Sequence, residues 1–343
     1  MWLRSDNAAG VDSSILAAMT ACNEGDAASY GEDALSRTLD ERFAEIFGAP
    51  AKVFPVPSGT AGNALALASL ADSFDAILCH EKAHAFDNES GATEAYTGGA
   101  RFLPVGGEHG RIDAEYLIEA LDIATGAGTS SHAPRVLTVT QLTEAGTVYS
   151  IAQLQELGTI TRQRGLYFHM DGARFANAVA TLGVTPADIT WKVGVDVLSF
   201  GATKNGTMYA DAVVFFDHSR AQRFKQRLKR GGHALSKTRY LAAQLLSYID
   251  GDRWLANARH ANLVASQLAA VIQRVPNADL VHPVEGNIIF AAFDDTTVRR
   301  FSEGGLALRS KGRTADGREM FRLVTSFATP AAESARLATI LGC

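Results

Sequence analysis

One lysine lies in a setting that suits chemistry better than solvation. Lys204 is the only lysine of VLSFGATKNGTMYADAVVFF (residues 197–216), where glycine, alanine, serine and threonine surround it between two apolar runs typical of strands. A solvated lysine usually lies among other charges on a helix face, so this one is expected to be buried. Burial disfavours the ammonium form, and a neutral amine attacks carbonyl groups.

The segment PSGT (residues 57–60) is a candidate anion site. It lies between an expected strand and an expected helix, where free backbone N–H groups and the hydroxyls of Ser58 and Thr60 can hold a phosphate. The segment lacks the glycine spacing of dinucleotide-binding loops and of P-loops. Taken alone, it is explained equally well as an ordinary capped turn.

The segment HMDGAR (residues 169–174) places a carboxylate directly after an apolar strand. Asp171 could hydrogen-bond a ring nitrogen and keep it protonated, or it could ligate a metal together with His169. Arg174 could pair with a carboxylate in bidentate fashion. A salt bridge that closes a loop is the plain structural alternative for Asp171.

The segment HEKAH (residues 80–84) matches a zinc-binding pattern literally. That chemistry requires a helix, because only a helix brings two histidines at this spacing onto one metal. Here the segment directly follows the apolar run DAILC (residues 75–79), so a loop at a strand end is the favoured interpretation. Open α/β sheets build their sites at such ends, and His84 therefore stays a candidate site residue.

The order of these groups along the chain indicates one cofactor. A phosphate site, a carboxylate for a ring nitrogen and a buried lysine are together what pyridoxal 5'-phosphate requires. Small neighbours of Lys204 leave room for a flat ring. Each signal is weak alone, whereas the ordered set is much more specific.

The elements that must position these groups alternate between strands and helices. Apolar runs at residues 135–142, 166–170, 196–200 and 211–216 predict strands, and residues 150–165 predict a helix that begins with a capping box of Ser150 and Gln153. This alternation predicts an α/β domain with a mainly parallel sheet. Beyond about residue 221, a basic helix, two long helices and further strands predict a smaller C-terminal α+β domain. We expect an N-terminal arm (1–25), a large domain (26–245) and a small domain (246–343).

Bulk composition narrows the class of protein. The chain has 343 residues, of which 47% are hydrophobic, and 32 Lys and Arg against 37 Asp and Glu give a net charge of −5. This mild acidity argues against nucleic acid as a partner. No apolar run is long enough to span a bilayer, and the N-terminus lacks the pattern of a signal peptide. The odd number of cysteines, Cys22, Cys79 and Cys343, predicts reduced thiols in a cytoplasmic protein.

With these residues in view, the chain resembles the threonine aldolases, which are fold type I pyridoxal phosphate enzymes of the aspartate aminotransferase superfamily. The resemblance covers nearly the whole length. It rests on six segments: LRSDN (3–7), SYGED (29–33), PSGT (57–60), HMDGAR (169–174), SFGATKNG (199–206) and FRLVTS (321–326).

The resemblance implies roles for particular residues. Lys204 is the Schiff-base lysine, Asp171 binds the pyridine nitrogen, and His84 stacks on the ring. The resemblance also implies that the cofactor phosphate is bound by Ser58, Gly59 and Thr60. The substrate carboxylate is bound by Arg174, Ser5 and Arg322, and Arg174 also lies near the ring hydroxyl. Arg227 matches an arginine that reaches the phosphate of a neighbouring subunit, with Tyr30 near the same site. The site is therefore expected at the interface of a homodimer, or of a dimer within a homotetramer.

The chain departs from the family pattern at two places, and the first concerns the proton that leaves the substrate hydroxyl. Many members carry a histidine after the central strand, where this chain reads QLTEAG (141–146), with Gln141 and Glu144. We expect His84 to be the base, supported by Glu144; the alternative is that Glu144 is a solvated loop residue. The chain also has Thr203 and Asn205 around Lys204 in place of the usual Ser-Lys-Gly.

The implied activity is retro-aldol cleavage of L-threonine, L-allo-threonine and related β-hydroxy-α-amino acids such as phenylserine, which yields glycine and an aldehyde. The only expected partners are the amino-acid substrate and further copies of the chain, with no nucleic acid, membrane or metal. Three alternatives stay open: a β-eliminating lyase or other enzyme of the same cofactor, a zinc hydrolase that uses His80, Glu81 and His84 with His169 or Asp171, and a non-catalytic relative.

Overall fold

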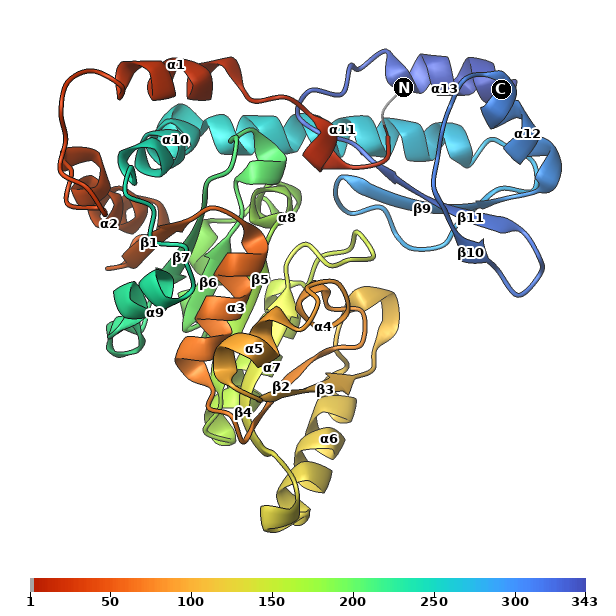
Figure 1. The fold of residues 1–343 in the computed structure, drawn as a ribbon. Coiled ribbons are helices and arrows are strands. Elements are labelled where there is room, and N and C mark those ends of the chain that lie inside the picture. Colours follow the sequence, from red (N-terminus) through yellow and green to blue (C-terminus); the bar gives the residue numbers. More distant parts are fainter. Residues whose placement is uncertain (1–2) are drawn as a thin grey trace.

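Two β-sheets organise the protein (Figure 1). The computed structural model describes residues 3–343, and within them the larger sheet has seven strands. Strand β7 is antiparallel to both of its neighbours, whereas the other strands run parallel, as the alternating sequence pattern predicted. In spatial order the strands are β1 (Lys52–Val56), β7 (Asp211–Phe215), β6 (Val197–Phe200), β5 (Tyr167–Gly172), β4 (Ala133–Thr140), β2 (Asp75–His80) and β3 (Arg101–Val105).

Helices cover both faces of this sheet, so its strands are buried on both sides. Ile77 packs toward the face with α3 and α9, whereas the next residue, Leu78, packs toward the opposite face with α2, α6, α7, α8 and α10. Burial on both faces explains why the strands read as continuous apolar runs. The helices are α2 (Ala34–Phe47), α3 (Gly59–Leu70), α4 (His84–Asp87), α5 (Ala92–Thr97), α6 (Ala114–Gly126), α7 (Ile151–Gln163), α8 (Phe175–Leu182), α9 (Phe224–Arg230) and α10 (Arg239–Ile249).

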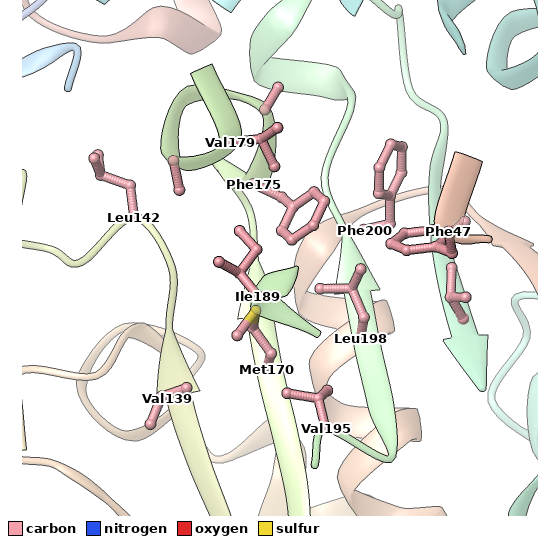
Figure 2. Close-up of a cluster of buried hydrophobic side chains, with 14 of the residues drawn as sticks. Phe47, Val139, Leu142, Met170, Phe175, Val179, Ile189, Val195, Leu198 and Phe200 are labelled. Carbon is pink, nitrogen blue, oxygen red and sulfur yellow. The ribbon is translucent and has the colours of Figure 1, made fainter. Parts of the chain in front are cut away.

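An aromatic cluster holds the end of β6 in place (Figure 2). The ring of Phe200, the last residue of β6, lies 5.9 Å from that of Phe175 and 6.4 Å from that of Phe47, measured between centroids. Tyr248 and Trp254 pack on the same ring at 6.1 and 5.7 Å. Because Lys204 follows four residues after Phe200, this rigid cluster supports the turn that carries the lysine.

The C-terminal part forms the second sheet, as expected. Its four antiparallel strands within the described residues are, in spatial order, β10 (Ser310–Arg313), β11 (Glu319–Val324), β9 (Ile288–Phe293) and β8 (Asp279–Leu280). Helices α12 (Asp295–Glu303) and α13 (Glu333–Leu341) accompany it.

The long helix α11 (Arg253–Ile272) joins the two parts (Figure 1). Trp254 and Ala258 near its start belong to the core of the large sheet, whereas Val264 and Leu268 belong to the core of the small one. The first part of α11 therefore packs in the core of the large sheet, and its later part packs in the core of the small sheet. The domain boundary expected between residues 245 and 246 stays a prediction.

The N-terminal segment also connects both parts. Leu3 is buried in the small core, and its carbonyl accepts a hydrogen bond of 2.8 Å from the N–H of Val324 in β11. Helix α1 (Ser13–Ala21) then packs on α10 (Figure 1). Between these two anchors, the chain passes the carboxyl edge of the large sheet.

Several local predictions are confirmed. Ser150 and Gln153 form the capping box of α7, and Gly165 follows this helix with a positive φ of 67°. The three cysteines are free thiols. Among the helices of residues 3–343, none has the length and apolar character needed to cross a membrane.

Candidate active site

A cavity of about 360 Å³ opens at the carboxyl ends of β5 and β6. The N-terminus of α3, the loop after each of these strands, and the start of β7 meet there, at the edge where open α/β sheets build their sites. Six residues expected from the sequence line this cavity: Ser58, Gly59, Thr60, His84, Asp171 and Lys204. Asn63, Glu89 and Asp211, none of which is a site residue expected from the sequence, line it as well.

The N-terminus of α3 forms one end of the cavity. Ser58 is its N-cap residue, and the Ser58 hydroxyl accepts a hydrogen bond of 3.3 Å from the N–H of Ala61. The first N–H groups of a helix have no acceptor within the helix, and the helix dipole adds a partial positive charge there. Gly59 and Thr60 bring such groups to the cavity wall. This end of the cavity is therefore suited to an anion such as a phosphate.

Lys204 lies in a short 3₁₀ turn (Thr203–Asn205) after β6. Burial lowers the pKa of its ammonium, and the charge of Arg174 lowers it further, against the opposing carboxylates of Asp6, Asp171 and Asp211. The neutral amine is thus more populated than in a solvated lysine. This is the electrostatic state that the small-residue surroundings predicted.

Two contacts fix the chain just before the lysine. One carboxylate oxygen of Asp211, at the start of β7, accepts hydrogen bonds from the N–H groups of Ala202 (2.7 Å) and Thr203 (2.9 Å). At Gly201, an added Cβ would lie 2.6 Å from the Cα of Ala173, so only glycine allows the loops after β5 and β6 to approach this closely. The close approach brings Lys204 beside the end of β5.

Asn205 explains one departure from the family pattern. Its buried amide donates hydrogen bonds to the hydroxyl of Tyr248 (2.6 Å) and to the carbonyl of Trp254 (2.8 Å). A glycine at this position could make neither bond. The side chain of Asn205 therefore anchors the far side of the lysine turn.

Asp171 is buried at the end of β5. Its two carboxylate oxygens accept hydrogen bonds from the N–H of Ala173 (2.9 Å) and from the amide of Asn63 (2.8 Å). His169 is also buried, but its two ring nitrogens pair with the hydroxyls of Thr138 (2.8 Å) and Ser199 (3.0 Å). Burial lowers the pKa of His169 to about 4, so this histidine is a neutral core residue.

The segment HEKAH does not form the helix that the zinc pattern requires. His80 ends β2, and α4 begins only at His84. The Nε2 atom of His80 lies 3.2 Å from the carbonyl oxygen of Gly107, and its Nδ1 accepts a hydrogen bond of 3.1 Å from the N–H of Lys82. His84 is separated from this arrangement and lines the cavity.

His84 has a buried carboxylate partner. Its Nδ1 lies 2.9 Å from Glu89, whose same oxygen accepts a hydrogen bond of 3.0 Å from Asn63. The hydrogen bond with Glu89 raises the pKa of His84. Glu89 follows α4 in the polar stretch DNES, which carries no sign of burial, and Asn63 lies in an otherwise apolar helix. The polar residue within that apolar run was the available signal for Asn63.

The segment QLTEAG contains one residue that supports the backbone, Gln141, and one polar residue that contacts the site, Glu144. Gln141 is buried, and its amide exchanges two hydrogen bonds of 3.0 Å with the backbone of Tyr149. Glu144 accepts a hydrogen bond of 3.0 Å from the N–H of His84. Burial raises the pKa of Glu144 to about 7, with the charge of Asp171 adding to the effect. Glu144 is half-buried and contacts His84, which supports the expected site residue over the alternative of a solvated loop residue, and its role stays a prediction.

Arg174 already has a partner within the chain. Its Nε and one terminal nitrogen donate to the two carboxylate oxygens of Asp6, at 2.7 and 3.0 Å. The Asp6 side chain is only 1% exposed and also accepts a hydrogen bond of 3.0 Å from Asn287. The bidentate edge of Arg174 is thus occupied, which leaves its remaining N–H groups for another ligand.

Arg322, by contrast, is a half-buried guanidinium without an acid. It lies in β11, and it makes no ion pair within the part of the chain that the structure describes. Burial and the charge of nearby Arg174 both lower the pKa of Arg322. An unpaired, partly desolvated arginine next to a second arginine favours binding of an anion between them.

Six expected site residues do not line the cavity around Lys204: Glu144, Arg174 and Arg322, described above, and Ser5, Tyr30 and Arg227. Ser5 accepts a hydrogen bond of 3.2 Å from the N–H of Asn7 and lines a separate cavity of about 320 Å³. Tyr30 is 50% exposed and lies on another cavity, of about 620 Å³, where the ammonium of Lys229 stands 4.4 Å from its ring centroid. Arg227 lies in α9 and is half-buried, near Asp72. The roles expected of these residues stay predictions.

Comparisons with known proteins agree with this geometry. The model of the beta-eliminating lyase family matches residues 3–296. A low specificity L-threonine aldolase from a Pseudomonas species is 37% identical over 312 residues, which cover 90% of this chain and 86% of that protein. The solved structure of a Leishmania major threonine aldolase superposes with a TM-score of 0.93 at 24% identity, covering 99% of this chain and 98% of that one. An aspartate aminotransferase from Rhodobacter sphaeroides superposes with a TM-score of 0.72 at 16% identity, covering 99% and 92%. The expected fold class, fold type I, is thereby confirmed.

The Asp6–Arg174 pair yields a stability prediction. Replacing Asp6 with Asn should lower the free energy of unfolding by about 3–5 kcal/mol, because it leaves the buried guanidinium without a counter-charge. The matched control is Asp122→Asn, which removes the same acid from an exposed pair with Arg164 (2.7 Å) and should cost less than about 1 kcal/mol. Urea unfolding of both variants measures the difference, and equal losses would contradict the assignment.

Proposed function

Because this chain belongs to the beta-eliminating lyase family and is related to its low specificity L-threonine aldolases, we propose that it cleaves β-hydroxy-α-amino acids by a retro-aldol reaction. The substrates are L-threonine, L-allo-threonine and related compounds such as phenylserine, and the products are glycine and an aldehyde. The family resemblance expected from the sequence motifs is confirmed. The observation that carries the proposal is the meeting of Lys204, Asp171 and the α3 N-terminus around one cavity.

These residues fit pyridoxal 5'-phosphate as the cofactor. Ser58, Gly59 and Thr60 would hold its phosphate at the end of α3. The buried carboxylate of Asp171 would hold the pyridine nitrogen in its protonated form, and Lys204, with its lowered pKa, would bind the aldehyde carbon. When bound, the cofactor supplies an electron sink for the electron pair released at the substrate Cα.

Arginines orient the substrate for cleavage. Arg322 offers an unpaired guanidinium fork for the substrate carboxylate, and Arg174 adds the N–H groups that Asp6 leaves free. Ser5 is a further expected ligand of that carboxylate. By holding the carboxylate, these residues would fix the orientation of the bonds at the substrate Cα, and orientation of the reacting bond is itself a source of rate acceleration. The arginines thereby direct the reaction toward the Cα–Cβ bond.

A base must remove the proton of the β-hydroxyl group. We assign this role to His84, whose imidazole lines the cavity, with Glu144 as the second group that takes part in proton movement. The hydrogen bond from the N–H of His84 to Glu144 holds the two residues together. A carboxyl group with a pKa of about 7 and a histidine are both matched to proton transfer near neutral pH.

A second subunit would complete the site. Tyr30 and Arg227 lie away from the cavity of their own chain, which supports a homodimer or homotetramer in which they serve the site of a neighbour. We place this assembly in the cytoplasm, in line with the three free thiols. Light scattering should give at least twice the 36.5 kDa of one chain. A mass of one chain in an active preparation would contradict the shared site.

Product analysis tests the proposed function. The purified protein, supplied with pyridoxal 5'-phosphate and L-threonine, should release glycine and acetaldehyde in equal amounts. Lys204→Ala should lose nearly all of this turnover, because it removes the amine that binds the cofactor. Ammonia and a 2-oxo acid in place of glycine would indicate a β-eliminating enzyme instead. Parallel assays with allo-threonine and phenylserine then rank the substrates.

The assignment of the base is tested by two variants. His84→Phe keeps a ring for stacking but removes the proton carrier, and it should lose most of kcat. Glu144→Gln keeps an acceptor for the N–H of His84 and should lose less. Because Glu144 accepts a proton only when ionised, its contribution rises with pH through about 7, and the variant should lack this part of the pH–rate profile. A larger loss in Glu144→Gln than in His84→Phe would reverse the assignment.

A further inference from the structure

Four polar side chains form a continuous hydrogen-bonded chain at the cavity wall. Asp171 of β5 accepts from Asn63 of α3 (2.8 Å), the same amide nitrogen donates to Glu89 (3.0 Å), and Glu89 pairs with Nδ1 of His84 (2.9 Å). Three separate elements and the loop after α4 contribute one residue each. The chain links the carboxylate expected at the cofactor nitrogen to the imidazole expected above the ring.

The side-chain amide of Asn63 hydrogen-bonds to two carboxylates. Both N–H groups of Asn63 are used, one on Asp171 and one on Glu89, whereas its carbonyl oxygen is buried and has no partner within residues 3–343. If the amide group were flipped, its carbonyl oxygen would lie against the carboxylates of Asp171 and Glu89. Leaving an acceptor unsatisfied is unfavourable, so the two carboxylates determine how this amide lies. Asn63 thus holds Glu89 in a fixed position relative to Asp171.

The side chain of Glu89 is buried, and burial disfavours the charged form of its carboxyl group. Its side chain is 1% exposed, and burial raises its pKa, as does the charge of Asp171. One of its oxygens has no partner within the described residues, so the other makes both contacts. A buried ionisable group needs a compensating interaction, and His84 is the only titratable residue with which Glu89 pairs among residues 3–343.

The side chain of His84 lines the cavity. The His84 side chain is 41% exposed, and its Nε2 makes no hydrogen bond within residues 3–343. The charged groups that face the ring are Glu89, Asp171 and Lys204, while Glu144 contacts its backbone N–H. A carboxylate on one ring nitrogen fixes a proton there and leaves the other nitrogen as an acceptor.

We propose that Glu89 is a positioning residue that holds His84 in the tautomer protonated at Nδ1, so that Nε2 is the atom that takes the proton of the substrate β-hydroxyl. The tautomer follows from this chain's own contacts. Only the last step, proton transfer from the substrate, rests on the proposed function.

The decisive variant is Glu89→Gln. A glutamine oxygen can still accept from Asn63 and from Nδ1–H of His84, so the variant keeps the shape and removes the charge. Glu94→Gln is the matched control, because Glu94 of α5 also has a buried oxygen without a partner in the described chain but does not contact His84. Glu89→Asp retains the charge on a shorter side chain and tests rescue.

The readout is nitrogen-15 NMR of histidine-labelled holoenzyme, with the His84 signals identified by their loss in His84→Phe. In the wild-type enzyme, neutral His84 should carry its proton on Nδ1. In Glu89→Gln, the midpoint of the His84 titration should fall by about one pH unit or more, because the carboxylate no longer stabilises the imidazolium. The acidic limb of the kcat/KM profile should move to lower pH with it. Glu94→Gln should match the wild type, and Glu89→Asp should lie closer to it than Glu89→Gln does.

Two results would overturn the inference: a neutral His84 protonated on Nε2 in the wild-type enzyme, or an unchanged His84 midpoint in Glu89→Gln. The tautomer in the wild-type enzyme decides the question even where the variant fails to fold. Failure of the proposed function is distinguishable, because an enzyme that releases no glycine from threonine would still report the tautomer of His84.

Discussion

The site depends on burying the amine of Lys204 near the cation Arg174, with no carboxylate paired to the amine among residues 3–343. Burial and Arg174 both disfavour its ammonium form. Arg174 can remain there because Asp6 neutralises it through two hydrogen bonds, and that bidentate contact keeps the carboxylate of Asp6 directed at the arginine. The same pairing leaves Arg322 with no acidic partner in the part of the chain that the structure describes. The Asp6–Arg174 ion pair thus gives Lys204, Arg174 and Arg322 different electrostatic roles.

That arrangement requires parts of the chain that are distant in sequence. Asp6 reaches the site because Leu3 is pinned to β11 on one side and α1 packs on α10 on the other. Arg322 arrives on β11 of the small sheet. The large sheet supplies the remainder at its carboxyl edge, where Gly201 allows two strand-end loops to touch. The site is therefore a property of the complete fold, and a local motif such as PSGT contributes only one wall of it.

The sequence predicts those parts of the site that local chemistry requires. Lys204 among small residues, Ser58 at a helix start and Asp171 at a strand end each carry a signal, and so do the strands that precede them. Glu89 and Asp6 carry none, because a carboxylate in a polar segment reads as solvated until tertiary packing buries it. Glu144 was singled out only because the segment QLTEAG departs from the family pattern, and its contact with the N–H of His84 depends on the fold. Asn205 was visible as a departure from the family pattern, but its role depends on Tyr248 and Trp254, which lie 43 and 49 residues further along the chain.

The most direct test of this account is to find which amine binds the cofactor. Reduction of the holoenzyme with borohydride fixes pyridoxal 5'-phosphate to the lysine that carries it, and mass spectrometry of the peptides then identifies that residue. The account predicts that the modified peptide contains Lys204, and that this modification is stoichiometric with bound cofactor. Modification of another lysine, or release of all cofactor unreduced, would contradict it.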